Sequence, residues 1–191
     1  MNDLMTLGMH RGWKRKTAAL ASQNLAGTAL DVSTGTGDLA FQLAKHTRVN
    51  RTVALDLLPE MIGRAQKRAN CRPGCEVNLL PRNMPDVRKA ISEMTRVIRP
   101  GGRVTLLELS PMESGMRAQL FRMYFHRLVP LVGSIVARDR DAYTYLPRSV
   151  DVFYGADELM EILREAGLHS VGYSRLGFGT VCLHWGDKPL N

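Results

Sequence analysis

Acidic side chains and cysteines are scarce in this chain of 191 residues, and long apolar runs are missing. Asp and Glu number 18 against 26 Lys and Arg, and this excess of positive charge favours anionic partners such as nucleic acid, acidic lipid or phosphorylated ligands. The three cysteines, Cys71, Cys75 and Cys182, form no disulfide framework, which suits a reducing cytoplasm. No signal peptide and no apolar run of ~18 residues is found, so we expect a cytoplasmic chain without a spanning helix.

The order of apolar segments predicts one α/β domain over residues 1–191. Expected strands alternate with expected helices, which implies parallel pairing with right-handed crossovers. The strands are expected at 28–33, 52–56, 75–80 and 103–109, and the helices at 38–46, 59–69, 84–98 and 157–166. The strand at 28–33 is expected to be buried on both faces, and 171–174 and 180–185 are expected to form an antiparallel pair. Residues 1–25 are expected to be helical with a basic face, and 112–150 to form an amphipathic cap.

The segment LDVSTGTGDLA at residues 30–40 predicts a strand, a glycine turn and the start of a helix. Gly35 and Gly37 let the backbone approach a ligand without a Cβ in the way. Asp56 ends the next strand, where its carboxylate is placed to accept hydrogen bonds from two ribose hydroxyls. The pattern therefore indicates a cofactor that contains an adenosine.

Two cofactors fit this turn. Gly35 and Gly37, with an alanine three residues further on, match the dinucleotide fingerprint of NAD enzymes. Asp31 favours S-adenosyl-L-methionine instead, because a carboxylate there repels a pyrophosphate and attracts an amino group and a positive sulfur. Asp38 is expected to add to that attraction. A purely structural role for Asp31, orienting the glycine loop, is the alternative.

Seven stretches carry a resemblance to one known family. They are MNDLMTLGMHRGWKR at 1–15, LDVSTGTGDLA at 30–40, Arg82-Asn83 with RVIRPGGR at 96–103 and LELS at 107–110, YTYLPRS at 143–149, and GTVCLHWGDKP at 179–189. Together they resemble the ubiquinone/menaquinone biosynthesis C-methyltransferases, in the same order and over nearly the whole chain. The resemblance implies a class I methyltransferase, a three-layer α/β sandwich with a Rossmann-like sheet.

The resemblance also implies the reaction and its residues. A methyl group would pass from S-adenosyl-L-methionine to a ring carbon of a polyprenylated quinol, demethylmenaquinol or a ubiquinone precursor, without a metal. Thr36 and Asp56 would hold the cofactor, together with Asp31, Gly35 and Gly37. Arg82 and Asn83 would face the acceptor ring as catalytic residues. We expect a membrane surface at the inner face and a second copy of the chain as partners, and no nucleic acid.

The chain departs from the family pattern at Pro81, which runs directly into Arg82. The family carries about twenty further residues at this junction, including a strand near the centre of the sheet. A parallel strand needs a crossover of about a dozen residues, which the chain cannot supply there. The sequence therefore predicts a sheet that lacks one central strand. It leaves open a second function, in which an inactive relative serves as a binding or assembly module in quinone biosynthesis.

A basic amphipathic stretch at residues 116–138 bears on the acceptor. Its apolar residues alternate with arginines, a pattern that fits contact with anionic lipid, a prenyl channel, or a cap packed on the sheet. An RNA methyltransferase is the other function that positive charge permits. The chain lacks the Asn/Asp-Pro-Pro-aromatic element of such enzymes, and it also lacks a clustered surface of stacking rings and arginines.

Overall fold

The computed structural model describes residues 6, 8–23, 25–69, 75–77, 86–111 and 153–190. The expected cap at 112–150, the catalytic pair Arg82 and Asn83, and the first residues of the helix expected at 84–98 lie outside this part of the chain. Among the described residues, no helix is long and apolar enough to cross a membrane.

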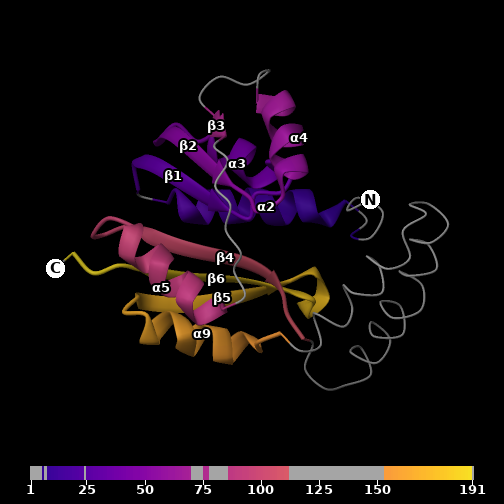
Figure 1. Ribbon diagram of the computed structural model, residues 1–191. Helices are drawn as coiled ribbons and strands as arrows, with labels where there is room; N and C mark the ends of the chain where they lie inside the picture. Colours follow the sequence, from indigo (N-terminus) through magenta and orange to yellow (C-terminus); the bar gives the residue numbers. More distant parts are fainter. Residues whose placement is uncertain are drawn as a thin grey trace.

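The N-terminal half forms a parallel sheet in the order β1-β2-β3 (Figure 1). Its strands are β1 (Gly27–Val32), β2 (Val49–Leu55) and β3 (Cys75–Val77). Helix α3 (Asp38–Leu43) connects β1 to β2, and helix α4 (Pro59–Ala69) connects β2 to β3. Proline suits the first turn of α4, because its fixed φ is helical and its missing N–H would have no partner there.

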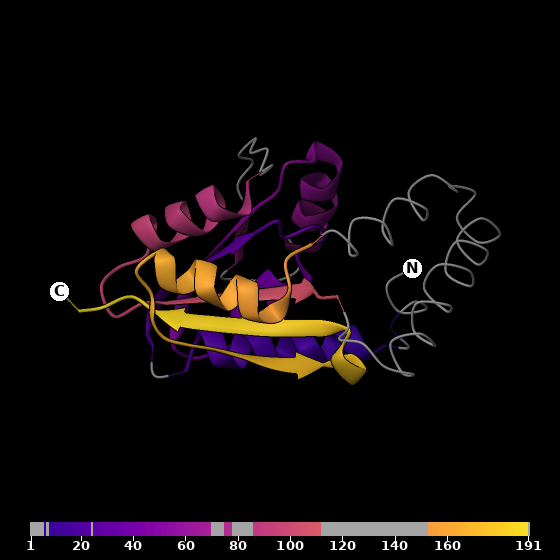
Figure 2. The same cartoon turned by 90° about the horizontal axis from the view of Figure 1, so that it is seen from below.

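The C-terminal half forms a second sheet in the order β4-β6-β5, with antiparallel pairing throughout. Its strands are β4 (Arg103–Leu109), β5 (His169–Leu176) and β6 (Val181–Asp187), with the short helix η2 (Gly177–Gly179) between the last two. Helices α5 (Val87–Val97) and α9 (Ala156–Glu165) cover one face of this sheet (Figure 2). The core between them consists of Ile91, Val104, Leu159, Ile162, Leu163 and Leu168.

Helix α2 (Met9–Ala21) joins the two halves, because it contacts both α3 and β4. Figure 2 shows α2 on one side of the second sheet and α5 and α9 on the other. Arg103 in β4 binds Asp187 through two nitrogens, at 2.6 and 2.9 Å, and also donates to the Leu20 carbonyl at the end of α2 at 3.2 Å. Gly177 lies so close to Trp13 that an added Cβ would stand 2.4 Å from the indole ring. These contacts hold α2 against the second sheet.

The α/β fold predicted from the sequence is confirmed, and the bounds expected at 59–69 and 103–109 agree with α4 and β4. The antiparallel pair near the C-terminus is also confirmed as β5 and β6. The parallel pairing implied by the alternation of strands and helices is confirmed for β1, β2 and β3. Strand β6 lies between β4 and β5 and pairs with β4 along its whole length, from Arg103 with Asp187 to Leu109 with Val181.

The expectation that the strand at 28–33 is buried on both faces is also wrong. Its residues alternate between partly buried and exposed over most of β1, and Leu30 is 44% exposed. The reason is that β1 is an edge strand, since β2 is its one partner in the part of the chain that the structure describes. In Figure 1, β1 and β4 are the edges by which the two sheets face each other.

His184 in β6 is buried beneath the first residues of α9. The side chain is 1% exposed, and its Nε2 donates to the Ala156 carbonyl at 2.9 Å. Among the described residues, its Nδ1 has no hydrogen-bond partner. Burial lowers the pKa of His184 because a charged imidazolium would lose its hydration there.

We expect the stability contributed by His184 to fall as the pH falls. The unfolded histidine takes up a proton near pH 6.5, and the folded one does so only at lower pH. Below pH 6.5 the free energy of unfolding therefore decreases, by at most about 1.4 kcal/mol for each pH unit. His184→Gln keeps a donor for the Ala156 carbonyl but does not titrate. Urea unfolding measures the free energy of unfolding of both proteins. The wild type should exceed His184→Gln by a smaller amount at pH 5.5 than at pH 7.5. The exposed His169→Gln is the control, and an equal advantage at both pH values would contradict the prediction.

Candidate cofactor site

The turn after β1 is held against β2 by backbone hydrogen bonds. Thr34 N donates to the Leu55 carbonyl at 2.9 Å, and Gly37 N donates to the Thr34 carbonyl at 3.0 Å. Gly35 and Gly37 have φ angles of 57° and 84°, in the region that side chains disfavour. A Cβ on Gly37 would stand 3.0 Å from the Phe41 ring, whereas one on Gly35 would have no atom within 4 Å. Gly37 therefore permits packing of α3, and Gly35 leaves open space above the backbone.

Asp31 lies near the end of β1 and is only 5% exposed. Its Oδ2 accepts a hydrogen bond from Thr34 Oγ1 at 2.6 Å. Desolvation raises the pKa of Asp31 to about 6, although the bond from Thr34 acts in the opposite direction. A carboxylate that burial destabilises in this way is suited to a positively charged ligand, because a nearby cation favours its ionised form.

Asp56 follows β2 and binds the glycine turn. Its Oδ2 accepts from Gly35 N at 2.7 Å, and its Oδ1 accepts from Leu58 N at 2.9 Å. A carboxylate oxygen can accept two hydrogen bonds, so each oxygen retains capacity for a ribose hydroxyl. Leu57 and Leu58, directly beyond Asp56, are 45% and 53% exposed. These leucines were not predicted as site residues, although two adjacent leucines after a strand-end carboxylate were the available signal.

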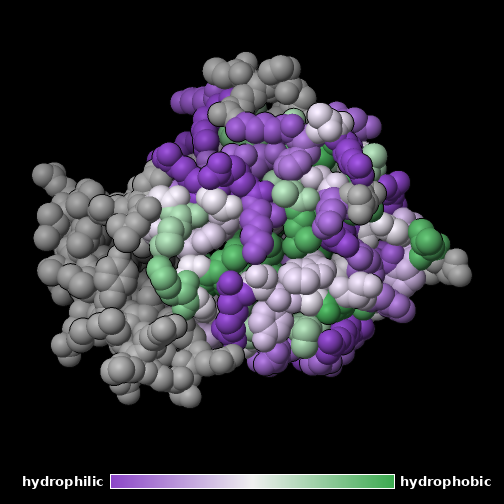
Figure 3. Space-filling model, turned by 180° about the vertical axis from the view of Figure 1, so that it is seen from behind, coloured by the Kyte–Doolittle hydropathy of each residue, from purple (hydrophilic) through white to green (hydrophobic). Residues whose placement is uncertain are grey.

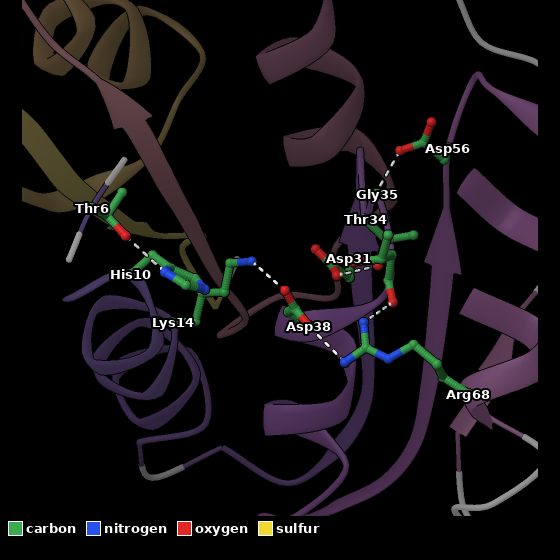
Figure 4. A network of polar contacts seen from close by, with 10 residues as sticks. Thr6, His10, Lys14, Asp31, Thr34, Gly35, Asp38, Asp56 and Arg68 are labelled. Atoms are coloured by element: carbon green, nitrogen blue, oxygen red, sulfur yellow. Dashed lines mark hydrogen bonds and ion pairs between the residues drawn. The ribbon is translucent and has the colours of Figure 1, made fainter. Parts of the chain in front are cut away.

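Asp38 connects three helices, as Figure 4 shows. Its Oδ2 accepts from Lys14 Nζ of α2 at 2.8 Å and its Oδ1 from Arg68 Nη2 of α4 at 2.7 Å. Arg68 also donates to the Thr36 carbonyl at 2.6 Å, and its guanidinium stands 4.9 Å from the Phe41 ring centroid. Burial raises the pKa of Asp38, but the bonds from Lys14 and Arg68 outweigh it and hold this pKa below its usual value.

The role expected for Asp38 therefore differs from what the structure shows. Its negative charge is already matched by Lys14 and Arg68, so little of it is left to attract a cofactor. Asp38 instead fastens α2 and α4 to the start of α3, and Arg68 supports the glycine turn through the Thr36 carbonyl.

The cofactor residues predicted from the sequence come together at the carboxyl ends of β1 and β2. They are Asp31, Gly35, Thr36, Gly37 and Asp56, and Figure 4 shows Asp31, Gly35 and Asp56 among them. The buried carboxylate fits a cation, the open space at Gly35 fits close approach of a ligand, and Asp56 fits a ribose. A pyrophosphate fits poorly, because it would lie beside two carboxylates. Within the described part of the chain, no group of His, Cys, Asp or Glu side chains could hold a metal ion.

Comparison with known proteins gives a family match over most of the chain. The model of the ubiE/COQ5 methyltransferase family matches residues 1–81 and 75–188. A demethylmenaquinone methyltransferase of Thermus thermophilus is 34% identical over 211 aligned positions, which cover 99% of this chain and 95% of the relative. A ubiquinone/menaquinone biosynthesis C-methyltransferase UbiE of Rickettsia peacockii is 33% identical over 217 positions, covering 96% of this chain and 85% of the relative.

Solved structures show the same fold at lower sequence identity. The N-methyltransferase NodS of Bradyrhizobium japonicum, in complex with S-adenosyl-L-homocysteine, has a TM-score of 0.62 and 14% identity, with 95% of this chain and 88% of NodS covered. The S-adenosylmethionine-dependent methyltransferase SibL has a TM-score of 0.64 and 20% identity, with 98% of this chain and 58% of the SibL chain covered. The class I methyltransferase fold predicted from the sequence is therefore confirmed.

These findings decide between the cofactors that the glycine turn left open. The match to methyltransferases extends through the turn and through Asp56, and it removes the dinucleotide alternative. The chain belongs to the ubiE/COQ5 methyltransferase family, and its cofactor is S-adenosyl-L-methionine.

Proposed function

We propose that this chain transfers the methyl group of S-adenosyl-L-methionine to a ring carbon of a polyprenylated quinol, demethylmenaquinol or a ubiquinone precursor. The observation that carries the proposal is the pairing of a buried carboxylate, Asp31, with an open glycine turn that Asp56 binds through Gly35 N. This combination favours a cationic adenosine cofactor. The names of the relatives from Thermus thermophilus and Rickettsia peacockii support the choice of acceptor.

Each group around the turn has a part in holding the cofactor. Asp31 would face its positive charge, and Asp56 would accept hydrogen bonds from the ribose hydroxyls. The backbone of Gly35 to Gly37 would pass close to it, and the exposed Leu57 and Leu58 would pack against the adenine ring. When bound, the cofactor supplies an electrophilic methyl group on a positively charged sulfur.

Arg82 and Asn83 are proposed to act on the acceptor. Loss of the proton from the quinol hydroxyl to water would make the neighbouring ring carbon nucleophilic. This carbon would bond to the methyl carbon as the bond from methyl to sulfur breaks and S-adenosyl-L-homocysteine leaves, and it would then lose its own hydrogen as a proton, which restores the aromatic ring. Arg82 would stabilise the resulting phenolate, and Asn83 would orient a water or a hydroxyl. Most of the rate gain is expected from positioning and from a dry, polarised site, and no step requires a metal.

We also propose that the chain lacks a segment of its relatives at the junction of Pro81 and Arg82. The alignments extend over 211 and 217 positions although this chain has 191 residues, so the relatives carry residues that it does not. The two family matches overlap at residues 75–81, which is typical of a family pattern interrupted there. Asp31 and Asp56 both lie before this junction.

Because the acceptor carries a polyprenyl tail, we propose a peripheral position on the cytoplasmic face of the inner membrane. Self-association into a homodimer remains a prediction from the sequence.

The proposed reaction is tested with labelled cofactor and, in separate vesicle preparations, demethylmenaquinol and a ubiquinone precursor, under reducing conditions. We expect S-adenosyl-L-homocysteine and a methylated quinol to form in equal amounts. Arg82→Ala should lower kcat by about 100-fold, the scale for removing one donor to a developing oxyanion, with an unchanged Kd for the cofactor. Cofactor binding without methylation of either quinol class would reject the acceptor, and full activity of Arg82→Ala would reject its catalytic role.

Asp56→Ala should weaken cofactor binding by about 1–3 kcal/mol, because hydrogen bonds to a charged group are lost. Calorimetry with S-adenosyl-L-homocysteine measures the change. Asp86→Ala is a suitable control, since Asp86 caps α5 by accepting from Lys89 N at 3.1 Å and lies in the other half of the chain. Equal affinities of wild type and Asp56→Ala would argue against the assigned site.

Asp31→Asn should stabilise the ligand-free protein while weakening cofactor binding. The folded pKa of about 6 lies above the unfolded 3.8, so at pH 7.5 the ionised carboxylate destabilises the fold by up to about 3 kcal/mol, a cost that disappears as the pH falls through 6 toward 3.8. Urea unfolding and calorimetry, each at pH 7.5 and 5.5, measure both effects. The wild type should also bind the cofactor less tightly at pH 5.5, where Asp31 is protonated. A variant that is less stable and binds normally would show that Asp31 only orients the loop.

A further inference from the structure

Charge is distributed unevenly between the helices of the two halves. Helix α2 has no acidic residue, and its basic residues are Arg11, Lys14, Arg15 and Lys16. Helix α4 carries Glu60 against Arg64, Lys67 and Arg68. Helix α9 has the opposite balance, with a single arginine against Asp157, Glu158, Glu161 and Glu165. The α2 and α4 side is therefore strongly basic, and in the other half α5 is also net positive, with Arg88, Lys89 and Arg96 against Glu93.

A cavity of about 550 Å³ lies among α2, α3 and α4, at the centre of this basic side. Its charged lining consists of Arg11, Lys14, Arg15, Lys45, Arg68 and Asp38. Asp38 is the one carboxylate in that lining, and it is already bound by Lys14 and Arg68. Cations are therefore in excess around the cavity.

Two of these cations are available to a ligand. Arg15 and Lys45 are exposed, and among the described residues neither forms an ion pair. An arginine can bind a phosphate through two parallel hydrogen bonds, and a lysine binds it as a point charge. The pair, on α2 and just beyond α3, suits a phosphate group that enters the cavity from solvent.

The side of α2 that faces away from the cavity packs against other parts of the protein. Thr17 and Ala18 are buried, Trp13 lies against Gly177, and the helix contacts β4. The basic side is left toward solvent, and Figure 3 shows hydrophilic residues crowded over the upper part of the molecule when it is seen from behind. Through Asp38, the cavity adjoins the glycine turn of the cofactor site.

We propose that this basic cavity seats the phosphate groups of an anionic phospholipid bilayer and docks the α2–α3–α4 face on it. Charge complementarity carries the choice of partner. RNA fits the same charge less well, because stacking of bases needs several exposed rings, whereas Phe41 in the lining is buried and His10 is the other ring there among the described residues. The proposal deepens the proposed function, since a polyprenylated acceptor lies in a bilayer beside the docked face.

Flotation with vesicles tests the proposal on the full chain. We expect binding to vesicles of phosphatidylcholine mixed with phosphatidylglycerol, and none to phosphatidylcholine alone. Binding should be lost between about 0.1 M and 1 M salt, where the screening length falls from about 10 Å to 3 Å. Arg15→Glu and Lys45→Glu should each weaken binding by at least about fivefold, the scale for one basic residue at an anionic surface.

Lys89→Glu is the matched control, because it makes the same change in net charge on the exposed side of α5, away from the cavity. It should bind vesicles as the wild type does. If Lys89→Glu weakened vesicle binding as much as Lys45→Glu does, net charge alone would govern binding, and this result would overturn the docking site.

Two further outcomes would overturn the choice of partner. One is binding of glycerol 1-phosphate in calorimetry as tight as binding of the vesicles, which would indicate a site for a free phosphate ligand. The other is tighter binding of single-stranded RNA that Lys45→Glu abolishes. Methyl transfer to a detergent-dispersed acceptor should be unchanged in Lys45→Glu. Vesicle binding without any methyl transfer would reject the proposed function and leave the docking site standing.

Discussion

A carboxylate buried at the end of β1 is the constraint on which the site depends. Asp31 lies where water hardly reaches it, and burial raises its pKa to about 6. An uncompensated buried charge is costly, so the position is useful only with a partner for the charged form. Thr34 supplies one hydrogen bond from within the turn, and in the proposed site the cofactor would supply positive charge. The open space at Gly35 would let that cofactor come close.

The rest of the N-terminal half holds this turn in place. Asp56 binds Gly35 from the neighbouring strand, and Arg68 binds the Thr36 carbonyl from α4. Lys14 and Arg68 meet on Asp38, which fastens the basic helix α2 to the start of α3. Because α2 also packs on β4, the geometry of the turn is coupled to the second sheet. In the described chain, no strand of the first sheet pairs with a strand of the second.

Local signals made the cofactor turn predictable from the sequence. An apolar strand segment, two glycines and an acidic residue after the next strand are each local features, and parallel pairing alone brings them together. The clamp on Asp38 was not predictable, because Lys14 and Arg68 lie 24 and 30 residues from it and meet it only through helix packing. The exposure of Leu30 was missed for a similar reason, since the edge position of a strand is a property of the sheet and not of the segment.

The interruption proposed at Pro81 and Arg82 would affect the two halves of the reaction differently. Strands β1 and β2 are paired from Gly27 with Val49 to Val32 with Leu55, and this pairing alone fixes the relative positions of Asp31 and Asp56 in the part of the chain that the structure describes. The two sheets are connected by helix α2, which packs on β4 and accepts a hydrogen bond from Arg103 at its Leu20 carbonyl. The proposed acceptor residues, by contrast, directly adjoin the interruption. Any consequence of the shorter chain should therefore fall on the placement of the quinol ring before it falls on the binding of the methyl donor.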